Sequence, residues 1–205
     1  MFNKILAGLA VFLLAANAHA SAIERLKSFV ASTRSGQADF SQEVQDKNGK
    51  RIQSASGAMH FVRPGKFRWI YQKPYVQWIV GDGERFWLYD VELSQVTVKK
   101  LDAALGSSPA ALLAGSNEIE RGFTLKENGE HDGLEWLQAL PKAQDTSFEK
   151  ILMAFNAQAD LTIMELYDAL GQKTVLRFSS LKRNPQLAPQ LFNFTPPKGV
   201  DVLGE

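Results

Sequence analysis

The chain has 205 residues, no cysteine and a formal net charge of +1 at neutral pH, from 23 basic and 22 acidic residues. Without cysteine there is no disulfide scaffold, no thiol nucleophile, no thiolate metal ligand and no attachment point for the lipid of a bacterial lipoprotein. The balanced charge argues against nucleic acid and against electrostatic attachment to anionic lipid, since both need clustered Lys and Arg.

Residues 1–20 have the pattern of a cleaved signal peptide. Lys4 gives the n-region its positive charge, residues 5–16 are apolar, and Ala18 and Ala20 are the small residues expected before a cleavage site. The apolar run is shorter than the roughly 20 residues that cross a bilayer as a helix, although an uncleaved anchor is the alternative. We therefore expect residues 21–205 to form a single domain in the periplasm of a Gram-negative bacterium.

The mature chain is predicted to begin with one helix and to continue as an antiparallel sheet. Residues 21–33 show apolar positions at helical spacing, namely Ile23, Leu26, Phe29 and Val30. From Gly36 the apolar period changes to two, and turn sequences such as Asn48-Gly49 recur about every ten residues. This pattern is typical of a mainly β domain whose sheet curls toward a barrel.

Residues 101–115 interrupt the strand pattern. Ser108 precedes Pro109, an apolar run follows, and Gly115 ends it, which predicts a short helix with a hydroxyl cap. The helix either plugs one end of the barrel or forms a mobile lid over it.

No catalytic or metal-binding motif is recognisable. The two histidines of the mature chain, His60 and His131, are far apart in sequence, and no nucleophile elbow, phosphate-binding loop or metal-ligand spacing occurs. A Ser-His-Asp site needs only to assemble in space, so an exported hydrolase stays possible. We expect no enzyme activity, no cofactor and no metal.

Met59, Phe61 and Arg63 share one face of a predicted strand. If the first two face the interior, the Arg63 guanidinium does too, and it needs acceptors such as free carbonyl groups at a helix end. The alternative is that the strand end before Pro64 bends into water. The residue pattern alone favours that alternative.

Aromatic residues are frequent on the predicted strands. Together with Arg63, the predicted lining of an interior cavity is Phe40, Met59, Phe61, Phe67, Trp69 and Trp87. A packed core is the alternative, but one sheet with few helices leaves a concave apolar face with little to fill it, as in small lipid-binding barrels. Trp87 has the opposite parity to Phe86 and Leu88, so only one of these two sets can face inward.

Five motifs in register give the chain a family resemblance. They are Ala38-Asp39-Phe40-Ser41-Gln42, Arg63-Pro64 followed by Phe67 and Trp69, Asp82-Gly83 followed by Leu88 and Tyr89, Gly106-Ser107-Ser108-Pro109, and Phe194-Thr195-Pro196-Pro197-Lys198-Gly199-Val200. On these motifs the sequence resembles the periplasmic outer-membrane lipoprotein carrier family, LolA, over most of the mature chain.

The resemblance implies an unclosed antiparallel β-barrel of about eleven strands with a small α-helical lid. It also implies a monomeric carrier that shelters lipoprotein acyl chains between an inner-membrane ABC transporter complex and an outer-membrane receptor. Arg63 would then tie the sheet to lid backbone near Leu113 and Ala114, and Phe67 would line the cavity entrance. The lid residues implied are Pro109, Leu112, Leu113 and Ala114.

Three other functions remain as alternatives. The outer-membrane receptor of the same pathway resembles the carrier in fold, but it is normally a lipoprotein and needs a cysteine. A carrier or sensor of another amphiphile would use the same cavity. The exported hydrolase is the third alternative.

Overall fold

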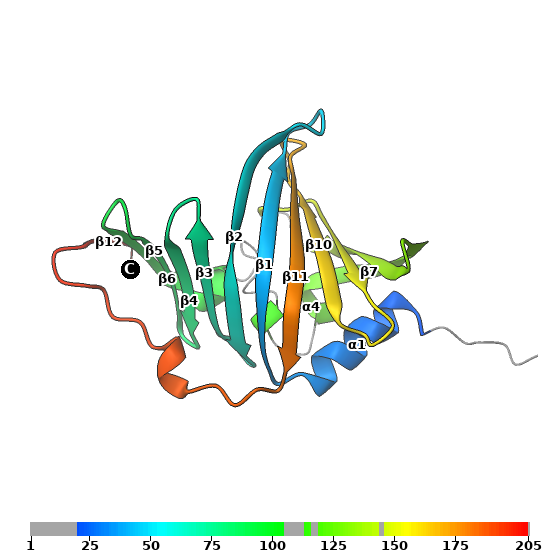
Figure 1. The fold of residues 1–205 in the computed structure, drawn as a ribbon, viewed down its shortest axis with the longest axis horizontal. Helices are drawn as coiled ribbons and strands as arrows, with labels where there is room; N and C mark the ends of the chain where they lie inside the picture. Colours follow the sequence, from blue (N-terminus) through cyan, green and yellow to red (C-terminus); the bar gives the residue numbers. More distant parts are fainter. Residues whose placement is uncertain (1–19, 105–112, 116–118, 144–145, 205) are drawn as a thin grey trace, which may run out of the picture.

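The computed structural model describes residues 20–104, 113–115, 119–143 and 146–204, which form one curved sheet with a few helices (Figure 1). The first part of the chain contains α1 (Ala22–Ser32), β1 (Ser35–Gln45), β2 (Arg51–Val62), β3 (Lys66–Lys73), β4 (Gln77–Asp82), β5 (Arg85–Asp90), β6 (Gln95–Lys100) and α2 (Leu101–Ala104). The second part contains α4 (Ile119–Gly122), β7 (Phe123–His131), β8 (Leu134–Pro141), β9 (Lys150–Phe155), β10 (Leu161–Tyr167), β11 (Lys173–Arg183), the 3-10 helix η1 (Pro189–Phe192) and β12 (Asp201–Gly204).

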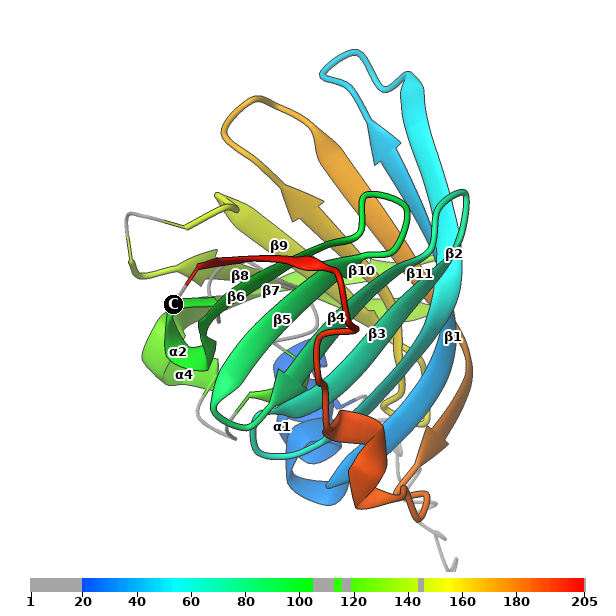
Figure 2. The ribbon, with the colours of Figure 1, turned by 90° about the vertical axis from the view of Figure 1, so that its left-hand side faces the viewer.

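The sheet is an unclosed barrel, as expected from the sequence. Among the described residues its order is β12-β6-β5-β4-β3-β2-β1-β11-β10-β9-β8-β7, twelve strands rather than about eleven. All neighbours pair antiparallel except β12 and β6, which are parallel. The pairing of β1 with β11 joins the run of strands β1 to β6 to the run β7 to β11, and β7 and β12 remain as separate edges. The sheet therefore curls without closing (Figure 2).

Helix α1 confirms the helix predicted over residues 21–33. Ser21 accepts a hydrogen bond from the Glu24 N–H, and the Glu24 carboxylate accepts one from the Ser21 N–H, so that a capping box fixes the first turn. The apolar side of the helix, with Leu26, Phe29 and Val30, is buried. No helix among the described residues is both long and apolar enough to cross a membrane.

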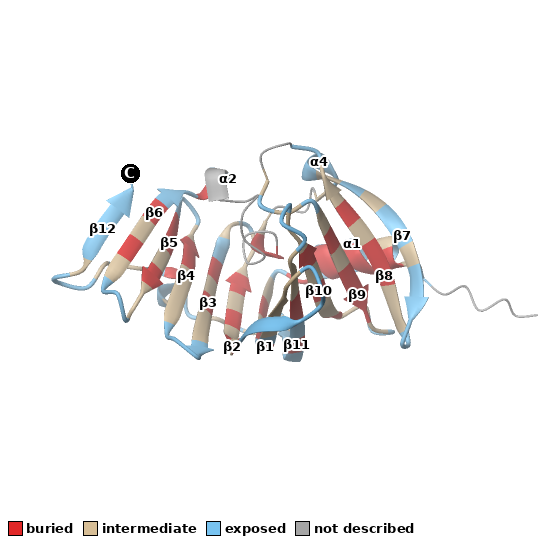
Figure 3. Ribbon diagram, turned by 90° about the horizontal axis from the view of Figure 1, so that it is seen from above, coloured by how far each residue is buried: buried red, intermediate tan, exposed pale blue. Residues whose placement is uncertain are grey.

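The two faces of the sheet are covered differently. Buried and less buried residues alternate along most strands, as the banding in Figure 3 shows. Helix α1 lies on the concave face, whereas residues 184–204 run across the outer face of β3 to β5 before β12 joins the edge (Figure 2). Side chains with opposite parity on one strand thus belong to two different apolar clusters.

Candidate functional site

The concave face gathers most of the residues predicted to line a cavity. Phe40, Met59, Phe61, Phe67 and Trp69 come from β1, β2 and β3 and belong to one apolar cluster. Each is at most 3% exposed. The rings of Phe40 and Trp69 lie 4.7 Å apart between centroids, and Trp69 meets Phe178 of β11 edge-on. The period-two pattern therefore placed these five side chains on one side of the sheet.

Three of these aromatic rings lie over glycines on the neighbouring strand. Phe40 pairs with Gly57, Phe61 with Gly36 and Phe67 with Gly81. A Cβ atom at Gly36 or Gly81 would lie 2.4 Å from the facing ring, and one at Gly57 would lie 3.0 Å from Phe40. Glycine thus leaves room for the facing ring at Gly36 and Gly81, and at Gly57 it also avoids the carbonyl oxygen of Ile70. These pairs cannot be predicted from the sequence, because they depend on the register of the strands.

The chain itself covers the concave face. Leu26, Phe29 and Val30 of α1 pack into the same cluster as the five lining residues, and so do Leu113 and Ala114 of the predicted lid. Leu113 is 5% exposed and Ala114 is fully buried. The expectation that little fills this face is therefore wrong for the structure described. A ligand that takes the concave face must displace some of these covering side chains.

Arg63 is held inside, contrary to the residue pattern's preference for a side chain that bends into water. Its Nε donates to the Thr33 carbonyl oxygen at 3.1 Å, and its guanidinium lies over the rings of Phe29 and Phe61, 5.8 and 5.2 Å from their centroids. Burial lowers the pKa of Arg63 to about 10. The guanidinium still carries its charge at neutral pH and depends on backbone oxygens for partners.

The lid is tied to the turn between β2 and β3. The Gly65 N–H donates to the Ala114 carbonyl oxygen at 2.7 Å, while Arg63 Nη1 reaches the Gly115 carbonyl oxygen at 3.5 Å, the long limit for a hydrogen bond. The lid contact expected of Arg63 is thus placed one residue beyond Ala114 and is weaker than the neighbouring backbone bond. Pro109 and Leu112, also predicted as lid residues, lie outside the described residues.

Trp87 does not lie on the concave face, so its assignment to the cavity lining is wrong. It belongs to a second cluster on the outer face, with Tyr89, Val80, Val96 and Val98. Phe194, from the segment that crosses this face, packs on Trp87 with ring centroids 5.5 Å apart. Phe86, of the opposite parity, belongs to the concave cluster. The C-terminal segment explains why aromatic residues are buried on both faces of β5.

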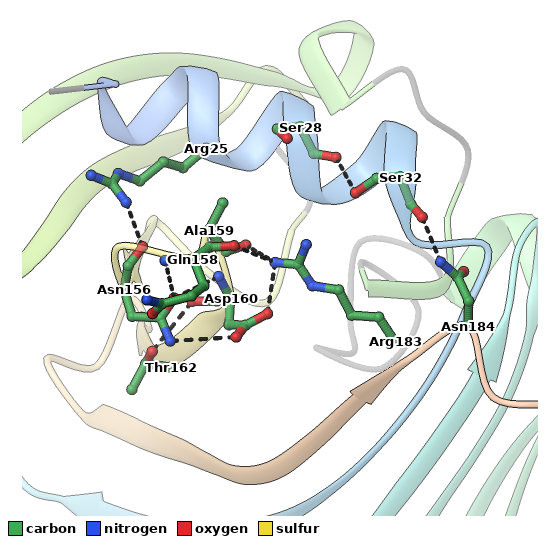
Figure 4. Close-up of polar contacts among 10 residues, drawn as sticks. All are labelled: Arg25, Ser28, Ser32, Asn156, Gln158, Ala159, Asp160, Thr162, Arg183 and Asn184. Carbon is green, nitrogen blue, oxygen red and sulfur yellow. Dashed lines mark hydrogen bonds and ion pairs between the residues drawn. The ribbon is translucent and has the colours of Figure 1, made fainter. Parts of the chain in front are cut away.

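Hydrogen bonds fix α1 to the sheet at both ends. At its start, the Glu127 carboxylate of β7 accepts from the N–H groups of Ala22 and Ile23, each at 3.1 Å. At its end, the Asn184 side-chain amide donates to the Ser32 carbonyl oxygen at 2.8 Å (Figure 4). The helix is therefore fastened at both of its ends over the concave face.

Two arginines also bind the turn between β9 and β10 (Figure 4). Arg25 of α1 donates to the Asn156 carbonyl oxygen at 2.6 Å. Arg183, at the end of β11, donates to the Gln158 carbonyl oxygen at 3.0 Å and pairs with Asp160 at 2.6 Å. Its guanidinium carbon also lies 5.2 Å from the centroid of the Phe29 ring. The turn and α1 thus form one rigid unit, which sequence spacing could not indicate.

Titratable groups are not gathered into a reactive cluster in the described part of the chain. No three His, Cys, Asp or Glu side chains there are placed to hold a metal ion. His60 lies on β2 and His131 ends β7, in opposite halves of the sheet. The chemistry that the concave face supports is burial of hydrocarbon.

Comparison with known proteins shows which family this chain matches. A family model described as "Outer membrane lipoprotein carrier protein LolA" matches residues 31–195. A protein of Nitrosospira multiformis named outer-membrane lipoprotein carrier protein is 56% identical over 187 residues, which cover 91% of this chain and 90% of the relative. A protein of the same name from Dechloromonas aromatica is 50% identical over 203 residues, 99% of this chain and 97% of the relative.

Solved structures with low sequence identity share the fold. A LolA superfamily protein from Nitrosomonas europaea has a TM-score of 0.52 and 13% identity, over 84% of this chain and 96% of that one. An uncharacterized conserved protein from Thermus thermophilus has a TM-score of 0.56 and 15% identity, over 89% of this chain and 96% of that one. These likenesses concern the fold alone.

Proposed function

This chain belongs to the family of the outer membrane lipoprotein carrier protein LolA, and we propose that it carries the acyl chains of lipoproteins on the concave face of its sheet. The observation that carries the proposal is a concave apolar face covered by residues of the same chain. Because hydrocarbon costs about 0.8 kcal/mol per methylene group exposed to water, acyl chains cross an aqueous space only when they are sheltered.

Acyl chains can bind the concave face only if the residues that cover it move. The hydrogen bonds of these residues favour movement of the lid segment over movement of α1. Helix α1 is tied to β7, to the turn between β9 and β10 and to the chain after β11. Among the described residues, Leu113 to Gly115 are tied to the turn between β2 and β3 by the Gly65 bond and the long Arg63 contact. The proposal is that this lid segment opens while α1 stays in place, so that lid and acyl chains compete for one face.

The route of transfer follows from the family. The carrier would take lipoproteins from an inner-membrane ABC transporter and deliver them to an outer-membrane receptor, as a monomer in the periplasm. Its relatives are named as carriers, which supports a function without catalysis. The receptor alternative needs a lipid-modified cysteine, and the sequence contains none. Cleavage before Ser21 is part of the proposal, and N-terminal sequencing of the periplasmic protein tests it.

Mass spectrometry of the purified periplasmic protein tests the cargo. We expect triacylated lipoproteins to co-purify with it and to be lost when Phe40 is replaced by glutamine. Free lipid without lipoprotein would favour the carrier of another amphiphile. The transfer route needs a separate assay with transporter-containing vesicles and a purified receptor, in which the protein should deplete lipoprotein from the first and load the second.

A further inference from the structure

The concave face becomes polar toward the end of the sheet that carries the β1–β2, β3–β4 and β5–β6 turns (Figures 1 and 2). On β3, Phe67 and Trp69 are followed on the same face by Tyr71. Across the strands, Tyr71 pairs with Gln77, and Gln77 pairs with Asp90. Gln42 continues the same face of β1 beyond Phe40. One row beyond the aromatic rings, the lining thus changes from hydrocarbon to amides and charges.

These residues line a pocket of about 180 Å³, which we call the head pocket. Its polar lining includes Gln42, Gln53, Tyr71, Lys73, Gln77 and Asp90, and Tyr75 also lines it. Tyr71 connects it to the apolar rows, because its ring meets Phe40 edge-on with 5.1 Å between centroids. The head pocket therefore adjoins the apolar lining of the concave face.

Several hydrogen-bond donors of the head pocket have no acceptor among the described residues, while the Asp90 carboxylate, which also lines it, accepts from the Leu93 N–H at 3.0 Å. The Tyr71 hydroxyl donates to Gln42 Oε1 at 2.9 Å, which leaves the two N–H bonds of the Gln42 amide. The side chains of Gln53, Lys73 and Gln77 donate to no residue that the structure describes. Amide and ammonium donors thus line the pocket from four strands, β1 to β4, and are available to a ligand.

A buried donor lies at the boundary between the two zones. Trp69 is 2% exposed, and its indole N–H has no hydrogen-bond partner among the described residues. The pKa of Tyr71 is raised to about 12, because burial outweighs the opposite effect of the nearby Trp69 N–H, which lacks the geometry of a hydrogen bond. A buried N–H without an acceptor costs free energy, so an acceptor supplied by a ligand would remove that cost.

We propose that the head pocket binds the ester and amide carbonyl groups at the acylated end of the cargo lipid. This inference rests on the proposed function and deepens it. Carbonyl oxygens only accept hydrogen bonds and lose free energy when they are buried without donors, whereas acyl chains need no donors at all. The acyl chains then lie on the apolar rows in the direction of Arg63, and Trp69, Gln42 and Gln77 donate to the head.

The test compares two synthetic lipopeptides that carry the same three chains on an N-terminal cysteine. In one the glycerol is linked by esters, and in the other by ethers, which lack the carbonyl acceptors. We expect the wild-type protein to bind the ester form about tenfold more tightly, the sum of two hydrogen bonds of ordinary strength. The double variant Gln42→Leu/Gln77→Leu should keep only about a threefold preference for the ester, the share that Trp69 supplies.

Two further variants separate the pocket from general stability. Trp69→Phe removes the indole N–H and keeps an aromatic ring, and should reduce the ester preference about threefold. Gln72→Leu, on the same strand as Tyr71 but exposed on the other face, should keep the full preference. Variants are compared only after their unfolding midpoints show that they are folded.

The outcomes distinguish the two proposals. If the wild type binds neither lipopeptide, the proposed carrier function fails. Equal binding of ester and ether by the wild type, or an undiminished preference of about tenfold in the double variant, would overturn the head pocket and leave the carrier function intact. Phosphatidylglycerol in ester and ether forms is the third arm. An ester preference there supports recognition of glycerol esters in general, and a preference confined to the lipopeptide supports recognition that also needs the cysteine amide.

Discussion

Arg63 is a cation held by backbone oxygens, and its partners decide what its removal does. It donates to Thr33 at the end of α1 and reaches Gly115 of the lid. Hydrogen bonds from a charged donor contribute about 1.5–3 kcal/mol, and the 3.5 Å contact belongs at the weak end. If the lid opens as proposed, Arg63 would bias it toward the closed position, together with the stronger bond between Gly65 and Ala114.

Arg63→Leu should therefore load normally and release slowly. Without the guanidinium, closure competes less with the acyl chains, and we expect about tenfold slower delivery to a receptor. A two-step transfer assay measures acceptance and release separately. Arg68→Leu is the matched control, because Arg68 also donates to a backbone carbonyl, that of Leu191, but on the outer face. Release by Arg63→Leu at the wild-type rate would show that Arg63 is not a latch.

His60 should make the fold sensitive to mild acid. Burial and the positive charge of Arg68 lower its pKa below 6.5, against a smaller opposite effect of Asp39. Because the unfolded imidazole takes up its proton at a higher pH than the folded one, stability falls as the pH drops through about 6.5 toward the folded pKa. His60→Gln should flatten that part of the curve of unfolding free energy, measured from about pH 7.5 down to about pH 5. Curves of equal slope would contradict this.

At the scale of elements, the two coverings of the concave face have different attachments. Arg25 of α1 and Arg183 of β11 both bind the turn between β9 and β10. The lid segment is hydrogen-bonded to the turn between β2 and β3. An element held by several side chains to separate strands opens at a higher free energy than one held at a single turn. We therefore expect amide hydrogen exchange in α1 to be slower than at residues 113–115.

Arg183→Met should loosen this anchor. The Gln158 carbonyl group and the Asp160 carboxylate would lose their partner while the apolar stem of the side chain is kept. We expect a loss of about 2 kcal/mol in the free energy of unfolding and faster exchange in α1. Arg177→Met, an exposed change on the same strand, is the control. Denaturant titration measures both variants, and equal losses would show that the contact with the turn contributes no specific stability.

At the scale of the whole molecule, the two faces of the sheet carry two different sets of buried residues. The concave face holds the aromatic lining and its cover, and the outer face holds the cluster of Trp87 and Phe194 that fastens the C-terminal segment. Phe40→Gln should weaken lipopeptide binding about tenfold or more, because a buried aromatic side chain loses about 2–3 kcal/mol of apolar contact. Lys47→Gln at an exposed turn should leave binding unchanged.

Trp87→Gln should act differently from Phe40→Gln. We expect it to leave binding close to the wild-type value and to increase proteolysis of residues 193–200, since their aromatic contact is lost. Limited proteolysis and a binding titration on the same sample measure both effects. A loss of binding as large as that of Phe40→Gln would place Trp87 with the ligand after all.

The sequence by itself determined the strands, the first helix and, for most strands, which side chains share a face. Apolar period is a local property, so Met59 and Phe61 could be placed on one face before any partner strand was known. It also identified the family, because the five motifs can be recognised in the sequence without knowledge of the structure. The sequence could not determine which side chains of β5 lie on the concave face of the sheet, since Phe86 and Trp87 are both apolar and both buried.

Only the tertiary structure decided those matters, because they depend on contacts between segments far apart in sequence. Phe194 reaches Trp87 across the outer face, and it is this contact that buries an aromatic side chain away from the cavity. Arg63 stays inside because Thr33 and the lid offer carbonyl oxygens there, which a strand pattern before a proline does not reveal. The glycines opposite Phe40, Phe61 and Phe67 likewise acquire their meaning only from register. Periodicity orients a side chain relative to its own strand, whereas register and long-range packing decide what that side chain meets.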